Sequence, residues 1–178
     1  MKVLVIVTDN TEESELIGTI SLLDRAGIKC IKASASSKEF IGSHKNVIVS
    51  DMLIKDVDTS EFEAIYLPGG SGSNNLRDDE RILKIVKDFK DKYMFAICAA
   101  PSILGKLGYL DGKEFACYPG FERFMPKGIK SNSGVAVSGN IITAKSVHFV
   151  TPFALEIIKM LKGNETKEKV MKEICWEE

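Results

Sequence analysis

The sequence has little of what marks a membrane protein or a nucleic-acid-binding protein. No apolar run approaches the roughly 20 residues that a membrane-spanning helix needs. The 24 basic and 25 acidic residues leave a formal net charge of −1, so no cationic excess is available for nucleic acid or acidic lipid. We therefore expect neither a membrane nor a nucleic acid among the partners.

The cysteines and histidines are also too few and too scattered for a disulfide framework or a metal centre. Cys30, Cys98, Cys117 and Cys175 include no CxxC pair, and the sequence has two histidines, so we expect no bound metal. The first segment, MKVLVIVTDN, lacks the small-residue cleavage site of a secretory signal. These absences predict reduced thiols in a cytoplasmic protein.

Phosphate-binding loops are missing as well. The glycine-rich segment LPGGSGSNN, residues 67–75, lacks the GxxxxGK pattern that cradles nucleotide phosphates. The segment after the first apolar run lacks the hydroxyl- and glycine-rich pattern of a flavin phosphate site. We therefore expect no cofactor.

Strand-like and helix-like stretches alternate along the chain. Four apolar runs are typical of strands buried on both faces of a parallel sheet: 2–7, 28–34, 64–67 and 93–97. Four stretches have apolar residues at helical spacing: 12–26, 79–91, 151–161 and 165–174. Short extended pieces are expected within 39–56, and a hairpin with a Gly139-Asn140 turn within 135–143. This order predicts one α/β domain over residues 1–178, with helices on both faces of a mostly parallel sheet.

The most informative segment is AICAAPS, residues 96–102, where an apolar strand is predicted to turn into a helix at Cys98. Pro101 suits the first turn of a helix, because the N–H groups there have no partner to lose. A thiol at this corner faces the first-turn N–H groups and the positive end of the helix dipole, which favours the thiolate. The alternative is a small buried cysteine that ends a core strand.

Three loops follow buried strands and are therefore expected at one edge of the sheet: residues 8–14, residues 69–75 and the Cys98 corner. Glu15 lies one turn into the predicted first helix, where its side chain can point back across that edge. Glu12 and Glu13 are instead typical of helix capping. Glu15 is therefore the carboxylate that we expect beside the cysteine.

The glycine-rich loop and Glu15 each offer something to a cysteine site. Gly69 and Gly70 form either a simple tight turn or a set of exposed backbone N–H groups that hold a developing oxyanion beside Cys98. A carboxylate and a thiolate in one partly buried site repel, so one proton should stay with the pair. We expect a reactive Cys98 with a lowered pKa and a protonated Glu15.

The chain resembles the ThiJ/PfpI superfamily, in the branch of the human Parkinson disease protein 7 and its bacterial relatives. The resemblance covers nearly the whole chain and lies in the order of four motifs: VLVIVTDNTEESE, RAGIKC, YLPGGSGSNNL and AICAAPSILGKLGYLDGKEFACYPGFE. It implies a flavodoxin-like sandwich, similar to class I glutamine amidotransferases, that forms a homodimer. By motif position it implies a nucleophilic, oxidation-sensitive cysteine at Cys98, its partner glutamate at Glu15, and backbone donors at Gly69, Gly70 and Ala99.

The resemblance also shows where this chain departs from the family. Arg25 stands where the family often carries an arginine near the cysteine. The proteolytic branch has a histidine directly after the cysteine, where this chain has Ala99, and the human-type branch has one where this chain has Tyr118. His148 precedes a predicted helix that can approach the cysteine edge, so it is either an accessory residue or a packing residue. The other histidine, His44, lies in a polar loop and is expected to be solvated.

Cys117 has two interpretations. It precedes Tyr118 in a segment that approaches the cysteine edge in relatives, so it is a candidate to resolve an oxidised Cys98 as a disulfide. The alternative is a buried strand cysteine.

The resemblance supports three functions. The first is an enzyme of glyoxalase or deglycase type, acting on a small reactive carbonyl through Cys98 and Glu15. The second is a non-enzymatic redox sensor or chaperone-like stress-protection dimer, in which an oxidant converts Cys98 to the sulfinate. The third, a protease or amidase, is disfavoured by Ala99, because a cysteine hydrolase needs a base beside its nucleophile. The missing histidine weakens the first function, whereas the second needs none.

Overall fold

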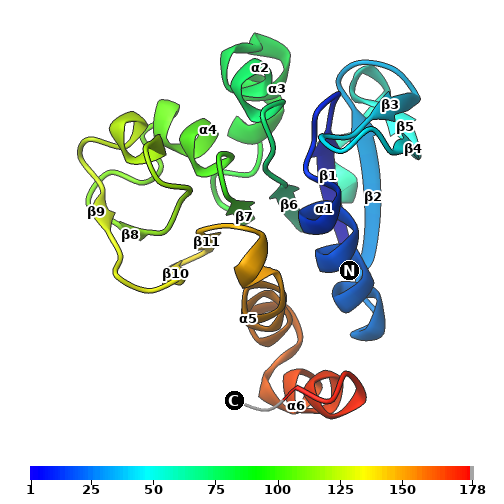
Figure 1. Cartoon of the computed structure of the whole chain (residues 1–178), viewed down its shortest axis with the longest axis vertical. Coiled ribbons are helices and arrows are strands. Elements are labelled where there is room, and N and C mark those ends of the chain that lie inside the picture. Colours follow the sequence, from blue (N-terminus) through cyan, green and yellow to red (C-terminus); the bar gives the residue numbers. More distant parts are fainter. Residues whose placement is uncertain (177–178) are drawn as a thin grey trace.

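The computed structural model describes residues 1–176, built around one seven-stranded sheet (Figure 1). Its strands are β1 (Lys2–Val7), β2 (Lys29–Ser34), β5 (Met52–Leu53), β6 (Ala64–Leu67), β7 (Tyr93–Ile97), β10 (Val135–Ser138) and β11 (Ile141–Ala144). They are arranged in the order β10-β11-β7-β6-β1-β2-β5, and only the β10–β11 pair is antiparallel. Two small ribbons lie outside this sheet: β3 (Glu39–Ile41) with β4 (Val47–Val49), and β8 (Glu114–Phe115) with β9 (Ile129–Lys130).

Helices cover both faces of the sheet. One face carries α2 (Ser73–Asp78), α3 (Glu80–Lys87) and α4 (Pro101–Lys106); the other carries α1 (Glu13–Arg25) and α5 (Val150–Lys162), with α6 (Asn164–Glu173) packed on α5 (Figure 1). The residues of β1 alternate between the two cores. Leu4 and Ile6 pack with α3 and α4, whereas Val3, Val5 and Val7 pack with α1 and α5. The predicted α/β sandwich with a mostly parallel sheet is confirmed.

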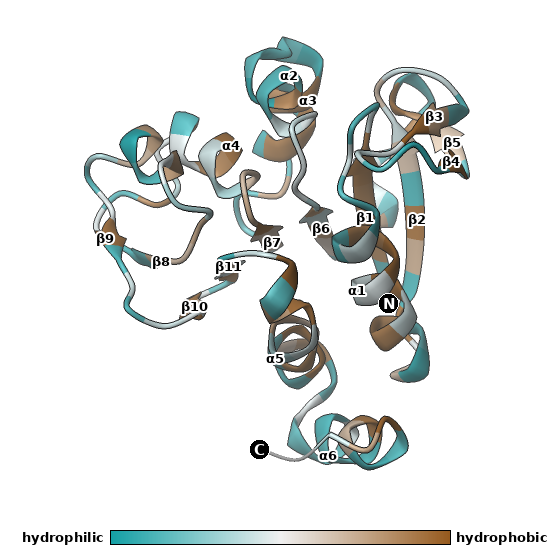
Figure 2. Cartoon of the chain, viewed as in Figure 1, coloured by the Kyte–Doolittle hydropathy of each residue, from teal (hydrophilic) through white to brown (hydrophobic). Residues whose placement is uncertain are grey.

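The hydropathy of the chain follows this layering. In Figure 2 the central strands and the inward turns of the helices are brown, while the outer turns are teal. Both buried clusters are rich in β-branched and aromatic side chains, which suit the pleated surface of a buried sheet. Within residues 1–176, no helix is long and apolar enough to cross a membrane.

Most of the predicted elements are present with small shifts at their ends. The strands 2–7, 64–67 and 93–97 match β1, β6 and β7, and Ser138 pairs with Ile141 across the predicted Gly139-Asn140 turn. The loop predicted over residues 69–75 is wrong in its second half, because α2 begins at Ser73. Only two residues of α2 are buried, so the sequence had no helical periodicity to reveal it.

The helix predicted over 79–91 is shorter than expected. Asp79 has an extended backbone, and its carboxylate accepts a hydrogen bond of 2.9 Å from the Arg81 N–H, which caps α3 at its start. The helix ends at Lys87, and residues 88–91 form a turn before β7. The remaining residues of the predicted helix, including buried Phe89, belong to this turn.

The three loops that follow β1, β6 and β7 meet at one edge of the sheet, as predicted. The Glu12 N–H donates to the Gly69 carbonyl at 3.0 Å, and the Gly72 N–H donates to the Asn10 carbonyl at 3.2 Å. The Cys98 N–H continues the sheet by donating to the Ala144 carbonyl of β11 at 2.9 Å. Backbone hydrogen bonds therefore join these loops to one another and to the sheet around Cys98.

Candidate active site at the Cys98 corner

Cys98 occupies a sharp corner between β7 and α4. Its φ of +63° lies in the left-handed region, which costs a non-glycine residue about 1–2 kcal/mol. The corner is held on both sides, because the Cys98 N–H bonds to Ala144 and the Cys98 carbonyl accepts from the Tyr118 N–H at 2.8 Å. A strained residue that its surroundings hold in place is typical of a functional position.

The thiol opens into a small pocket beyond the carboxyl end of β7. The pocket has a volume of about 240 Å³, which is smaller than the clefts of about 300–1,000 Å³ that hold drug-sized ligands. Backbone and aromatic groups dominate its lining, which comprises Gly70, Ser71, Asn74, Cys98, Ala99, Tyr118 and Phe121. Asn74 and Phe121 lie within the motifs that carry the resemblance, but sequence reasoning did not single them out.

Glu15 lies beside the thiol and is buried, with 1% of its surface exposed. Its Oε2 accepts a hydrogen bond of 2.9 Å from the Gly69 N–H, and its carboxyl group bonds to the Cys98 thiol. Burial raises the pKa of Glu15 to about 7, against the lowering effect of these two hydrogen bonds. Glu15 therefore holds its proton to a much higher pH than an exposed glutamate.

The prediction of a lowered pKa for Cys98 is wrong. Burial raises the pKa of Cys98 to about 12, and the negative charge of Glu15 acts in the same direction. The N–H groups of Gly70 and Ala99 bond to the sulfur and lower its pKa, but they do not outweigh burial. Sequence reasoning counted the helix start and the N–H groups, and it had no measure of burial at the corner.

Gly70 and Ala99 direct N–H groups at the sulfur, whereas Gly69 serves Glu15 instead. The prediction of Gly69 as an oxyanion donor is therefore corrected, because its N–H is already engaged. Gly69 must still be glycine, since a Cβ there would lie 2.5 Å from the Cys98 Cβ and would overlap the Glu15 carboxylate. Gly70 has a φ of +94°, which favours glycine directly.

The structure separates the candidate accessory residues. Tyr118 lies in the pocket, half exposed. His148 is exposed in the turn before α5, where its ring packs edge-on against Phe149 at 4.8 Å, and it does not line the pocket. Cys117 is buried in the core on the α4 side, which fits a packing role.

Arg25 is not at the site, so this part of the family-based expectation is wrong for the structure. It lies at the far end of α1, about 15 Å along the helix from Glu15 at 1.5 Å per residue. Its Nε pairs with the Glu173 Oε1 of α6 at 3.2 Å, and its Nη1 bonds to Ser21. Arg25 therefore links α1 to α6.

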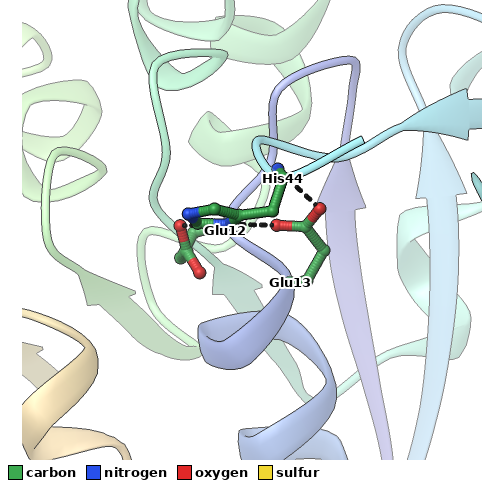
Figure 3. Close-up of side chains that lie close together, drawn as sticks. All are labelled: Glu12, Glu13 and His44. Carbon is green, nitrogen blue, oxygen red and sulfur yellow. Dashed lines mark hydrogen bonds and ion pairs between the residues drawn. The ribbon is translucent and has the colours of Figure 1, made fainter. Parts of the chain in front are cut away.

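A second polar cluster lies at the exposed rim beside the site and combines Glu12, Glu13 and His44 (Figure 3). The His44 ring is 3.0 Å from the Glu13 Oε2 and 3.5 Å from the Glu12 Oε2. Glu13 also accepts from the His44 N–H at 2.8 Å and from the Asn46 amide at 3.2 Å. His44 is exposed, as expected, but it is ion-paired as well as solvated.

These contacts fasten the loop between β3 and β4 to the start of α1. Burial raises the pKa of Glu13, but hydrogen bonds from its own backbone, His44 and Asn46 lower it to about 2. The hydrogen bond to Glu13 raises the pKa of His44. The three ligand-type side chains lie close enough to hold a cation, yet these hydrogen bonds already account for their arrangement. Sequence reasoning missed the cluster because its parts are about 30 residues apart in the chain.

The chain is similar in sequence to several described proteins. A deglycase from Pyrococcus abyssi is 30% identical, over 91% of this chain and 100% of that protein. The glutathione-independent glyoxalase DJR-1.2 of Caenorhabditis elegans is 29% identical, over 94% of this chain and 91% of that protein. A Bacillus subtilis protein, YraA, whose name assigns it provisionally to the cysteine proteases, is 31% identical over 90% and 98%.

The fold is also similar to solved structures. The oxidised DJ-1 of Toxoplasma gondii superposes with a TM-score of 0.93 at 30% sequence identity, and each chain covers 99% of the other. The family model of the DJ-1/PfpI family matches residues 1–160. Because the match covers most of the chain and includes the Cys98 corner, the glycine-rich loop and Glu15, this protein belongs to the DJ-1/PfpI family.

Proposed function

We propose that this protein is a cysteine enzyme that acts on reactive dicarbonyls such as methylglyoxal. The observation that carries the proposal is the Cys98 thiol in a small pocket, bonded to a buried Glu15 whose pKa is about 7. The N–H groups of Gly70 and Ala99 point at the same sulfur and are suited to hold an oxyanion on the neighbouring carbon. The names of the Pyrococcus and Caenorhabditis relatives agree with this chemistry.

The proposed reaction needs no oxidant. The Cys98 sulfur attacks the aldehyde carbon, the carbonyl electron pair moves to oxygen, and this oxygen takes the proton shared by Cys98 and Glu15. The Glu15 carboxylate then removes the proton from the former aldehyde carbon and returns it to the adjacent carbon. The hydroxyl proton on the first oxygen passes to the former ketone oxygen, which leaves a thioester of lactate. Water cleaves the thioester and restores the thiol. Methylglyoxal and water thus give lactate.

Lactate formation from methylglyoxal by the purified protein tests this proposal. Many turnovers per protein are expected, and Cys98→Ser should abolish them. Cys175→Ser is the matched control, because Cys175 is exposed and does not line the pocket, and it should keep full activity. Equal lactate formation by the wild type and Cys98→Ser, or none by either, contradicts the proposal.

A second candidate function, redox sensing through Cys98, is favoured by one observation. Neither histidine is among the residues that line the pocket, and oxidation of a thiol needs no histidine base. A protonated Glu15 would hydrogen-bond a Cys98 sulfinate and stabilise it. Mass spectrometry after mild peroxide separates the outcomes: one sulfinate per chain without turnover supports sensing. A Cys98–Cys117 disulfide instead would support a resolving role for Cys117.

A protease or amidase remains the weakest of the functions. The name of the Bacillus subtilis relative points to it, but a cysteine hydrolase needs a base to protonate its leaving group. Ala99 follows the cysteine, and within residues 1–176 the pocket lining supplies no histidine. Release of an amine from a chromogenic peptide amide would revive this function.

We further propose that the protein is a homodimer and works in the cytoplasm. The apolar side chains Ile17, Ile41, Val47 and Val49 are exposed, although such side chains usually gain from burial. Ile41 and Val47 face each other across the β3–β4 ribbon. Ile17 lies one turn beyond Glu13, which contacts the loop of that ribbon. A second copy of the chain could cover this face, and the four unpaired cysteines suit a reducing compartment.

A further inference from the structure

Asn74 lines the pocket with only half of its side-chain hydrogen-bonding capacity in use. It lies in the first turn of α2 and lines the pocket of Cys98. Its Oδ1 accepts a hydrogen bond of 3.0 Å from the Nη1 of Arg77. Among residues 1–176, the Nδ2 of Asn74 has no hydrogen-bond partner. Because the oxygen is turned to Arg77, the amide N–H groups are the part of this side chain that remains for a ligand.

Arg77 is held tightly enough to keep that orientation. Its guanidinium lies 4.0 Å from the centre of the Phe124 ring, and 13% of its side chain is exposed. Its Nη2 also bonds to Asp78 at 3.2 Å, and Asp78 pairs with Lys106 at the end of α4 at 2.8 Å. A stacked guanidinium with two fixed partners is a rigid anchor, because its planar fork loses little freedom when it binds.

Part of the pocket lining is aromatic and uncharged. Tyr118 and Phe121 contact edge to face with ring centres 6.4 Å apart, and Phe121 packs on Phe124 at 5.8 Å. None of the residues that line the pocket carries a positive charge, and the Cys98–Glu15 pair carries a negative charge once it ionises. An anionic ligand is therefore disfavoured, whereas a neutral ligand with a small apolar substituent fits.

We propose that Asn74 binds the second carbonyl oxygen of the substrate, a neutral 2-oxoaldehyde; this inference rests on the proposed function. Sγ of Cys98 bonds to the aldehyde carbon as the carbonyl electron pair moves to oxygen, which faces Gly70 and Ala99 and takes the proton of the Cys98–Glu15 pair. The Asn74 amide donates to the ketone oxygen on the next carbon. Arg77 is a positioning residue that keeps this amide turned to the pocket.

The test measures how well aldehydes protect Cys98 from alkylation by iodoacetamide, with methylglyoxal and propanal as the two probes. Both form a hemithioacetal, but propanal lacks the second carbonyl group. In Asn74→Ala, half-protection by methylglyoxal should need roughly five- to tenfold more aldehyde, the equivalent of one hydrogen bond, while propanal is unaffected. Asn75→Ala is the matched control, because Asn75 is the exposed neighbour outside the pocket.

A second variant keeps the test decisive if Asn74→Ala is poorly folded. Asn74→Asp can still accept from Arg77 but cannot donate, so it should show the same selective loss for methylglyoxal. Glyoxylate, an anionic oxoaldehyde, should protect the wild-type thiol less well than methylglyoxal. An equal loss for both aldehydes in the Asn74 variants, no loss at all, or better protection by glyoxylate overturns the proposal.

The positioning role of Arg77 is tested by asking whether the effect of its substitution depends on Asn74. Arg77→Met should lower protection by methylglyoxal and spare propanal, and the double variant Arg77→Met with Asn74→Ala should lose no more than Asn74→Ala alone. Additive losses would show that Arg77 acts independently of Asn74 and would overturn its positioning role. None of these readouts needs turnover, so the absence of lactate would refute the proposed enzyme while the contact with Asn74 could still be measured.

Discussion

At the scale of single residues, the site is governed by one proton shared between a carboxyl group and a thiol. Glu15 is buried, and burial raises its pKa to about 7, while the pKa of Cys98 is raised to about 12. The first proton therefore leaves the pair near pH 7 and the second only in strong alkali. In the intermediate range the pair carries one negative charge, which lies on Glu15 because burial holds the pKa of Cys98 far above that of Glu15.

The rate of Cys98 alkylation should follow the second proton. In the wild type, the rate with iodoacetamide is expected to stay low through pH 7 and to rise only at alkaline pH. Glu15→Gln removes the negative charge that raises the pKa of Cys98, so the rise should move to lower pH. A Glu15→Gln curve that matches the wild type would remove Glu15 from the site.

The same carboxyl group should make the fold less stable as the pH rises. The folded-state pKa of Glu15, about 7, is above the ordinary glutamate pKa of 4.5, so the folded protein binds more protons between these values and its unfolding free energy falls as the pH rises. The loss is roughly 3 kcal/mol between pH 4.5 and pH 7. Denaturant unfolding at pH 5 and pH 8 measures it. Glu15→Gln should lose this component, while Glu165→Gln, on exposed α6, should behave as the wild type.

At the scale of elements, the junction of β7 and α4 has a strained backbone at the residue that carries the thiol. Cys98 has a φ of +63°, which only glycine adopts without cost. Cys98→Gly should therefore be more stable than Cys98→Ala by about 1 kcal/mol, although both lack the thiol. Thermal unfolding of the two variants measures the difference. Greater stability of the alanine variant would mean that the corner is not strained.

The ribbon of β3 and β4 is fastened to α1 by the ion pair of His44 and Glu13. The pKa of His44 is raised by this contact, so the contact is complete at low pH and is lost as the pH rises through that pKa. Titration of the His44 ring by NMR should give a midpoint above 6.5, and Glu13→Gln should lower it. Glu39→Gln, an exposed change in the same ribbon, should leave the midpoint in place. The same low midpoint in the wild type and Glu13→Gln would contradict the contact.

At the scale of the whole molecule, the exposed face of α1 and the β3–β4 ribbon should govern assembly. Val47→Lys places a charge at the centre of this face, so it should convert a dimer into a folded monomer. Sedimentation gives the mass, and circular dichroism checks the fold. Ile129→Lys is the control, because Ile129 is equally apolar and exposed but lies on β9. A wild-type monomer, or a dimer that survives Val47→Lys, contradicts the proposed interface.

The sequence by itself determined the parts of this protein that depend on local patterns. Local patterns predicted the strands β1, β6 and β7 and the Gly139-Asn140 turn. Strand burial and turn conformation both depend on neighbouring residues in the sequence. The order of strands and helices was enough for the layered fold. It was also enough for the meeting of three loops at Cys98, because parallel strands end at the same edge.

Only the tertiary structure decided the properties that depend on contacts between distant segments. Burial raised the pKa of Cys98, which a helix start alone would lower, and the Glu15 carboxylate took the Gly69 N–H that the glycine-rich loop offered. Arg25 pairs with Glu173 of α6. Asn74 lines the pocket from α2, a helix whose sequence has no apolar periodicity. The physical reason is common to all four: desolvation and hydrogen-bond competition depend on which groups the fold brings together, and residue spacing does not encode them.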